Sequence, residues 1–141
     1  MKAISLWQPW ASAMAMGLKK NETRSWPTKH RGDLVICSAK KILTEAEIKA
    51  TNKTVFDIWK ENLPYGFALC VVEVYDCIPT EFALGLSAIE LNLGDYTPSR
   101  FVWITRNCRV LKEPIPIVGR QGIWNLSFYE AAKITTSLHN S

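Results

Sequence analysis

The sequence predicts an α+β fold, a small mixed or antiparallel β-barrel with flanking helices. Apolar runs typical of strands recur along the chain at uneven lengths, with only two or three helical segments between them. This order argues against a wound βαβ sheet, in which a helix follows each strand. The 141 residues, 48% of them hydrophobic, suffice for one compact core. We therefore expect a single domain over residues 1–141.

Five strands are expected from alternating polarity or from runs of β-branched and aromatic residues. They are residues 3–7, 33–39, 67–78, 101–111 and 122–126. We interpret residues 80–96 as a short helix followed by an irregular loop, and residues 113–118 as a proline-rich connection.

Three helices have sequence signals at their ends. Pro9 suits a first helical position because its missing N–H is not needed there, and Gly17 is expected to end that helix. Capping-box patterns, a hydroxyl followed three residues later by Glu, begin the other two helices at Thr44 and Ser127. The middle helix is expected to break near residues 51–54.

Charge is unevenly distributed along the chain. Residues 1–41 carry eight basic and two acidic side chains, and residues 99–141 carry six basic and two acidic. The middle, residues 42–98, carries three basic and nine acidic. The net charge of +4 is too small by itself to indicate a nucleic-acid binder. If the two basic ends meet in the fold, however, they form one positive face.

Six tryptophans are unusual in a chain of this length. Four are expected to pack inside, in strands or on the inner face of the middle helix: Trp7, Trp59, Trp103 and Trp124. The other two, Trp10 and Trp26, flank a polar segment and are expected to contact a ligand.

No pattern for a metal, a cofactor or a membrane span is present. The four cysteines form no C-x-x-C pair and both histidines lie far from other ligand-like residues, so we expect no metal and no cofactor. There is no signal-peptide pattern and no run of about 18 apolar residues. We expect a cytoplasmic protein that does not contact a membrane.

Three segments carry polar residues that suggest chemistry, and the first is residues 17–26. An extended backbone there places Glu22, Arg24 and Trp26 on one face, with Lys19 just past the helix end. A lysine beside a carboxylate can relay protons or act as a nucleophile. The alternative is a solvated edge strand in which Glu22 and Arg24 merely pair.

The second segment is the strand at residues 101–111, where Arg106 interrupts an apolar face and Asn107 and Arg109 follow. Either a bulge shifts the register after Thr105, or Arg106 leaves the core for a groove. We expect one of the two arginines to face a polar cavity, and the alternative is a surface residue paired with a local carboxylate.

The third segment is residues 118–124, where Gly119 and Gly122 flank Arg120 and Gln121. Two glycines permit a tight backbone and close approach of a ligand, and glutamine offers both a donor and an acceptor to a base edge. A plain turn is the alternative. Neither a P-loop nor a dinucleotide-binding pattern occurs.

Taken together, these segments resemble the ASCH (activating signal cointegrator homology) domain family. The similarity lies in residues 5–11, in Gly17-x-Lys19-x-x-Glu22-x-Arg24, in Trp103-x-x-x-Asn107-x-Arg109 and in Gly119-x-Gln121-Gly122. The resemblance implies a PUA-like β-barrel whose helices flank a cleft, lined by the motif residues together with Gln8, Pro9 and Trp10. It also implies a link to RNA or DNA binding, RNA processing or coactivator-like roles.

One branch of the family removes the acetyl group of N4-acetylcytidine with a motif lysine and a threonine three residues later. Lys19 matches that lysine, but Glu22 stands where the threonine is expected, so this sequence departs from that branch. The position of a further catalytic carboxylate is open between Glu73 and Glu90.

The first functional hypothesis is a binding module for RNA, DNA or a modified nucleoside. Base stacking is assigned to Trp10 or Trp26, phosphate contacts to Lys19, Arg24 and Arg120, and base-edge hydrogen bonds to Gln8 or Gln121.

The second hypothesis is a metal-independent amidohydrolase or ribonuclease using the same cleft. Lys19 would be nucleophile or base, and Glu22 would relay protons or position water. Arg24 or a backbone N–H would stabilise the oxyanion. A third is a protein-interaction module, with residues 80–96 as its contact surface. The sequence leaves the choice between enzyme and binding module open.

Overall fold

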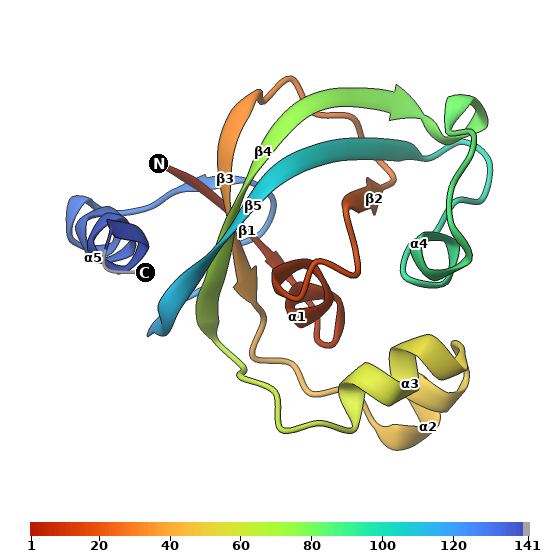
Figure 1. Ribbon diagram of the computed structural model, residues 1–141, viewed down its shortest axis with the longest axis horizontal. Coiled ribbons are helices and arrows are strands. Elements are labelled where there is room, and N and C mark those ends of the chain that lie inside the picture. Colours follow the sequence, from red (N-terminus) through yellow and green to blue (C-terminus); the bar gives the residue numbers. More distant parts are fainter. Residues whose placement is uncertain (140–141) are drawn as a thin grey trace.

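A computed structural model describes residues 1–139 and shows a mixed sheet of six strands with helices on both faces (Figure 1). The strands are β1 (Lys2–Leu6), β2 (Asn21–Arg24), β3 (Gly32–Ser38), β4 (Phe67–Pro79), β5 (Phe101–Pro116) and β6 (Trp124–Asn125). Their order across the sheet is β2-β5-β4-β3-β1-β6. β1 and β3 run parallel, and the other pairs are antiparallel.

The predicted α+β class, with a mixed sheet and flanking helices, is confirmed. The long strands β4 and β5 curve together across the molecule, as in a barrel (Figure 1). Within the described residues, β2 and β6 end the sheet without pairing with each other, so the barrel is open. The helices are α1 (Trp10–Ala15), α2 (Glu45–Lys49), α3 (Lys53–Trp59), the 3₁₀ turn η1 (Thr80–Phe82), α4 (Ala88–Asn92) and α5 (Phe128–His139).

Both faces of the sheet are covered, which explains the uninterrupted apolar run in β3. Leu34 and Ile36 pack on the face covered by α1, whereas Val35 and Cys37 pack on the face covered by α5. A strand buried on both sides is apolar at successive positions rather than at alternate ones. A further apolar cluster joins α1 to α2 and α3, so these short helices form one layer beside the sheet.

The local helix signals act as predicted. Thr44 and Glu47 make both hydrogen bonds of a capping box at the start of α2, and Ser127 and Glu130 do the same at α5. Asn52 caps α3, so the middle helix is broken where expected. Pro9 was expected at the first helical position but is the N-cap of α1, so this helix begins one residue later than predicted.

β5 differs from the prediction in its length and its register. It continues to Pro116, through residues expected to form a connection. Val71 of β4 pairs with Arg109 and Glu73 with Arg106, so two residues of β5 lie opposite one residue of β4. Asn107 has φ +53° in this bulge, which confirms a register shift after Thr105.

Of the four tryptophans predicted to pack inside, three do so and Trp7 does not. Trp103 and Trp124 are buried, and Trp59 packs against the helical cluster. Trp7 was expected in the core, but its side chain is 48% exposed. β1 ends at Leu6, so Trp7 lies beyond the alternation that would have turned it inward.

No helix within residues 1–139 has the length and apolar composition needed to cross a bilayer.

Candidate functional site

Two cavities adjoin beside β1 and β2. The motif cavity, about 560 Å³, is lined by Lys19, Glu22 and Arg24 among others. The loop cavity, about 920 Å³, is lined by residues 117–122 and by Trp26 among others. Ser5, Trp7 and Arg24 line both cavities. We therefore describe them together as the groove.

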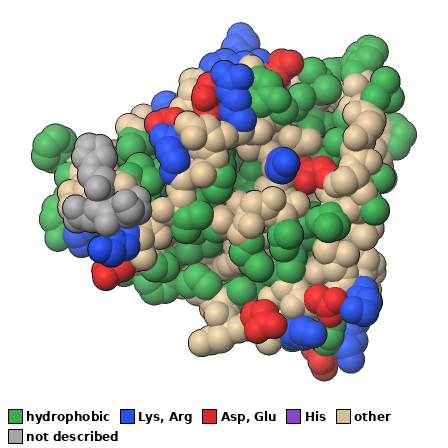
Figure 2. All heavy atoms as spheres, viewed as in Figure 1, with side chains coloured by type: hydrophobic (Ala, Val, Ile, Leu, Met, Phe, Trp, Pro, Cys, Tyr) green, Lys and Arg blue, Asp and Glu red, His purple; other side chains and the backbone are tan. Residues whose placement is uncertain are grey.

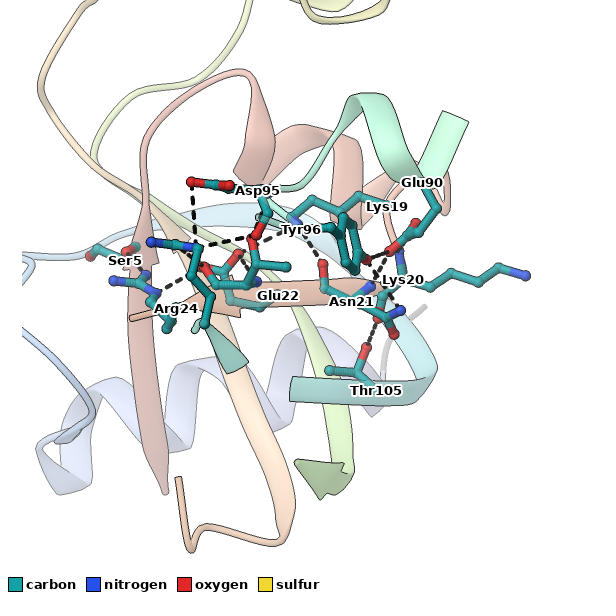
Figure 3. Close-up of polar contacts among 12 residues, drawn as sticks. Ser5, Lys19, Lys20, Asn21, Glu22, Arg24, Glu90, Asp95, Tyr96 and Thr105 are labelled. Atoms are coloured by element: carbon teal, nitrogen blue, oxygen red, sulfur yellow. Dashed lines mark hydrogen bonds and ion pairs between the residues drawn. The ribbon is translucent and has the colours of Figure 1, made fainter. Parts of the chain in front are cut away.

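Glu22 lies between two cations in the wall of the motif cavity (Figure 3). Its Oε1 is 3.4 Å from Lys19 Nζ, and its Oε2 is 3.0 Å from Arg24 Nε. Lys19 is 2% exposed and Glu22 8%. Buried charges need partners of opposite sign because they have lost their hydration. The predicted shared face of Glu22 and Arg24 therefore exists, and Lys19 joins it as an internally neutralised cluster.

Backbone groups fix the positions of these three side chains. Lys19 Nζ donates to the Asn21 carbonyl, and Glu22 Oε1 accepts from the Thr23 N–H at 3.1 Å. Arg24 Nη2 donates to the Ser5 carbonyl at 3.2 Å, which ties β2 to β1 across the groove (Figure 3). The cluster thus presents ordered donors and acceptors to whatever enters the cavity.

Glu90 of α4 anchors the first residue of β2. Its carboxylate accepts the N–H groups of Lys20 at 3.0 Å and of Asn21 at 2.7 Å, and the Tyr96 hydroxyl donates to it at 3.3 Å. Glu90 is 6% exposed. Burial, followed by the neighbouring carboxylate, raises the pKa of Tyr96. Glu90 lines neither cavity. Its described contacts instead fix the position of β2, the strand that carries the motif residues Glu22 and Arg24.

The wall beside β2 comes from residues 94–100, of which only residues 94–96 belong to a segment that the sequence singled out, as a protein-contact surface. The Asp95 N–H donates to Thr23 Oγ1 at 2.9 Å. Arg100 Nη2 donates to the Thr23 carbonyl at 3.3 Å, and its Nε lies 3.4 Å from Asp95 Oδ2. The hydrogen bond from the Thr97 hydroxyl is the main cause that lowers the pKa of Asp95. Nothing in the sequence around Thr23 indicates that it binds residues 94–100. This wall is therefore identified only by the hydrogen bonds between that loop and β2.

The loop cavity forms where residues 117–122 pass over β1. A Cβ on Gly119 would lie 2.6 Å from Ser5 Oγ, so glycine permits this close approach. Ser5 Oγ is buried and has no hydrogen-bond partner in the described structure. Trp26 packs edge-on against Trp103, with ring centroids 4.8 Å apart, and its carbonyl accepts from the Trp103 indole N–H.

Of the residues predicted for ligand contact, seven line the groove: Trp10, Lys19, Glu22, Arg24, Trp26, Arg120 and Gln121. Gln8 does not. It is fully buried, and its amide donates to Ser12 Oγ and to the Pro64 carbonyl while accepting from the Ser12 N–H. Its hydrogen-bonding groups join α1 to the segment before β4, so they are not available to a base edge. Pro9 is also buried, beneath α1.

Gly17, Arg106 and Asn107 line a smaller cavity of about 280 Å³, which also reaches Lys19. Arg106 donates to Glu73 at 2.9 Å, and Arg109 donates to Asp33 at 2.6 Å. The sequence left open whether such an arginine faces a polar cavity or pairs with a local carboxylate. Arg106 does both. The bulge in β5 places both arginines outside the groove.

Residues 1–139 contain no group of three or more His, Cys, Asp or Glu side chains arranged to hold a metal. Glu73 lies at the surface in its pair with Arg106, 32% exposed at the side chain. Of the two carboxylates considered for a catalytic role, Glu90 is the one beside the motif strand.

Comparison with known proteins supports the family that the motifs indicate. The ASCH domain family model matches residues 4–115. Two curated relatives, both named Activating signal cointegrator 1, align over 129 residues and 87% of this chain: the human protein at 32% identity and the mouse protein at 30%. The chain spans 22% of the length of these relatives.

A crystal structure of ASCH from Zymomonas mobilis has the same fold, with a TM-score of 0.58 at 14% sequence identity, covering 96% of this chain and 93% of the other. A mutant of the same Zymomonas mobilis protein has a TM-score of 0.57 at 15% identity, covering 96% of each chain. Both structural neighbours are ASCH proteins, and the likeness shows a shared fold. On the family match and the sequence relatives together, this chain belongs to the ASCH domain family.

Proposed function

We propose that this ASCH domain recognises RNA through a base, plain or modified, held in the motif cavity. Membership of the family supports a nucleic-acid-related domain at a coarse level. The observation that carries the proposal is the arrangement in the motif cavity, where Trp7 and Trp10 line the same space as the Lys19–Glu22–Arg24 cluster.

The cavity has the size and the chemistry for a nucleoside. About 560 Å³ lies within the range of small-molecule sites, roughly 300–1,000 Å³. Proteins recognise unstacked RNA bases by stacking them on aromatic rings or guanidinium planes and by hydrogen bonding to their edges. Trp10, half-buried between two apolar clusters, offers a rigid ring, and Arg24 offers an adjacent guanidinium.

The test is to measure binding of cytidine, N4-acetylcytidine and a labelled single-stranded RNA to the wild type and to Arg24→Gln. We expect RNA affinity to fall by about tenfold or more, because hydrogen bonds to charged groups contribute roughly 1.5–3 kcal/mol. The matched control is Arg31→Gln, which removes an exposed arginine that bonds only to nearby carbonyls. Absence of binding by every probe would overturn the proposal.

Hydrolysis is the second candidate, because Lys19 Nζ and Glu22 Oε1 are 3.4 Å apart at the cavity wall. Lys19 would serve as nucleophile or base and Glu22 as proton relay. Incubation with N4-acetylcytidine and with labelled RNA decides the matter. Turnover that disappears in Lys19→Ala supports the enzyme, and binding without turnover by the wild type refutes it.

A protein-interaction role is supported by the name shared by the two relatives, Activating signal cointegrator 1. In this chain, the segment after β4 exposes Phe82 at 69% and Leu84 at 86%. Phe82→Ser with Leu84→Ser should then abolish capture of a partner while leaving RNA binding intact; unchanged capture contradicts the role.

We also propose a cytoplasmic location, where the four free thiols would stay reduced.

A further inference from the structure

Within the described residues, the loop cavity is lined by positively charged but not by negatively charged side chains. Three cationic side chains line it, Arg24, Lys40 and Arg120, and no Asp or Glu is among its described lining residues. On the face shown in Figure 2, Lys and Arg side chains are instead interspersed with Asp and Glu. Lys40 comes from the first basic segment of the sequence and Arg120 from the last. The two basic ends of the chain therefore meet at this cavity.

Two of these cations have no partner in the protein. Neither Arg120 nor Lys40 makes a hydrogen bond or an ion pair with another residue in the described part of the chain, and both are exposed. The other five arginines all donate to carboxylates or carbonyls: Arg24, Arg31, Arg100, Arg106 and Arg109. Unpaired cations beside a cavity are able to neutralise phosphates, with release of counterions.

Two indole rings lie beside these cations. Trp7 is 48% exposed and Trp26 37% exposed, and both line the loop cavity. Trp7 also lines the motif cavity, so its ring stands where the two cavities meet. Lys41 Nζ lies 4.3 Å from the centroid of the Trp7 ring and holds it by a cation–π contact. A base in either cavity is thus within reach of the same indole.

Ser5 adds an independent observation at this junction. Its Oγ is buried beneath Gly119 and has no partner among the described residues. A buried hydroxyl without a hydrogen bond costs free energy. Ser5 lines both cavities, and its carbonyl already holds Arg24.

We infer that the loop cavity is a second nucleotide subsite, so that the ligand is a single-stranded polynucleotide of at least two nucleotides. This inference rests on the proposed base site in the motif cavity. The next base stacks on Trp7 or Trp26, while Lys40 and Arg120 contact the connecting phosphates. A duplex does not fit this arrangement, because its bases are already stacked and cannot reach separate rings.

The first test is a length series with cytidine, a cytidine dinucleotide and a tetranucleotide, as RNA and as DNA of the same sequence. Affinity should rise at least tenfold from the nucleoside to the tetranucleotide. The RNA and DNA arms establish whether a ribose hydroxyl is recognised. A blunt-ended duplex of two separate strands should bind at least tenfold more weakly than the single strand.

The second test removes the two unpaired cations in Lys40→Ala/Arg120→Ala. Log affinity for a single strand falls with log salt by about 0.7 for each phosphate contact, so this slope should decrease by about 1.4. The matched control is Lys112→Ala/Lys133→Ala, which removes the same charge from residues that line neither cavity. Cytidine binding should be unchanged in the Lys112→Ala/Lys133→Ala control.

The outcomes separate this inference from the proposed function. If cytidine binds but affinity does not rise with length, or if both double variants change the salt slope equally, the second subsite is refuted and the base site stands. If no nucleoside or oligonucleotide binds the wild type, the proposed function itself fails.

Discussion

The cationic side chains of the two cavities differ in burial and in whether they have a partner in the protein. In the motif cavity, Lys19 and Arg24 are held by Glu22 and by backbone carbonyls. In the loop cavity, Lys40 and Arg120 face solvent without a partner within residues 1–139. The difference follows from burial, since a buried charge must be neutralised while an exposed one keeps its hydration. The first arrangement favours orientation of a bound group, and the second favours electrostatic attraction of an anion.

The largest expected effect comes from removing the shared carboxylate of the motif cavity. Glu22→Ala leaves Lys19 buried without its counter-charge, so the free energy of unfolding should fall by about 3–5 kcal/mol in urea denaturation. Glu61→Ala, which removes an exposed carboxylate on the loop after α3, should change it by less than about 0.5 kcal/mol. A loss below about 1 kcal/mol for Glu22→Ala would show that the cluster is hydrated rather than buried.

The anchor of the motif strand gives the next prediction. Glu90→Ala removes the acceptor for the N–H groups of Lys20 and Asn21, at an expected cost of about 1–3 kcal/mol. Hydrogen exchange at these two amides should accelerate by more than exchange in β3. Glu45→Ala serves as the control, because it removes only an exposed pair with Lys49. Unchanged exchange at both amides would contradict the anchoring role.

Substitution of Trp7 should weaken ligand binding, whereas substitution of the buried Trp103 should lower the stability of the fold. Trp7→Ala is expected to weaken binding of a single-stranded oligonucleotide by about 1–3 kcal/mol, the range for loss of one base–aromatic stack. The buried Trp103→Ala should instead destabilise the fold by about 3–5 kcal/mol. Trp7→Phe, which keeps a ring, should recover part of the affinity. Equal affinity of wild type and Trp7→Ala, measured by fluorescence anisotropy, would remove Trp7 from the ligand-binding surface.

The smallest effect concerns the ion pair of Asp33 and Arg109, outside the groove. The hydrogen bond from Arg109 is the main cause that lowers the pKa of Asp33 below its usual value. The carboxylate therefore stabilises the fold above about pH 4 and loses this contribution as the pH falls through the lowered pKa. Asp33→Asn should cost less than about 1 kcal/mol at neutral pH, and this cost should decrease as the pH falls through the lowered pKa. A difference that persists in acid would indicate a packing effect.

Much of the fold was predictable because its signals are local. Thr44 and Ser127 close hydrogen bonds within three residues, so their helices are visible in the sequence. The register shift after Thr105 was one of two alternatives drawn from one arginine on an apolar face, and the structure has this shift. The continuation of β5 to Pro116 was not predicted, since prolines usually end a ladder and the pairing with β4 decides otherwise.

The candidate site was predicted in part. The residue pattern placed Lys19, Glu22 and Arg24 together, because side chains alternate along an extended strand. It missed Trp7, which was assigned to the core because the predicted strand was one residue too long. It also missed Lys40, Asp95 and Arg100, whose segments reach the groove only through tertiary contacts.

Gln8 and the two β5 arginines show the opposite error. Each lies within a family-like motif, yet Gln8 is used inside the molecule and Arg106 and Arg109 pair with local carboxylates. A motif identifies the residue type at a position but does not show which neighbour has already engaged its polar atoms. The partner comes from a residue distant in sequence, Pro64 for Gln8 and Asp33 for Arg109.

Local sequence was enough to predict the capped starts of α2 and α5, the central strands and the Lys19–Glu22–Arg24 cluster, since each depends mainly on residues close in sequence. The lining of the groove depends instead on tertiary packing, because burial of both sheet faces brings residues 5–7, 19–26, 38–40 and 117–122 together. The same packing joins the two basic ends of the chain at Lys40 and Arg120. It also settles whether each charge is buried with a partner or left facing solvent.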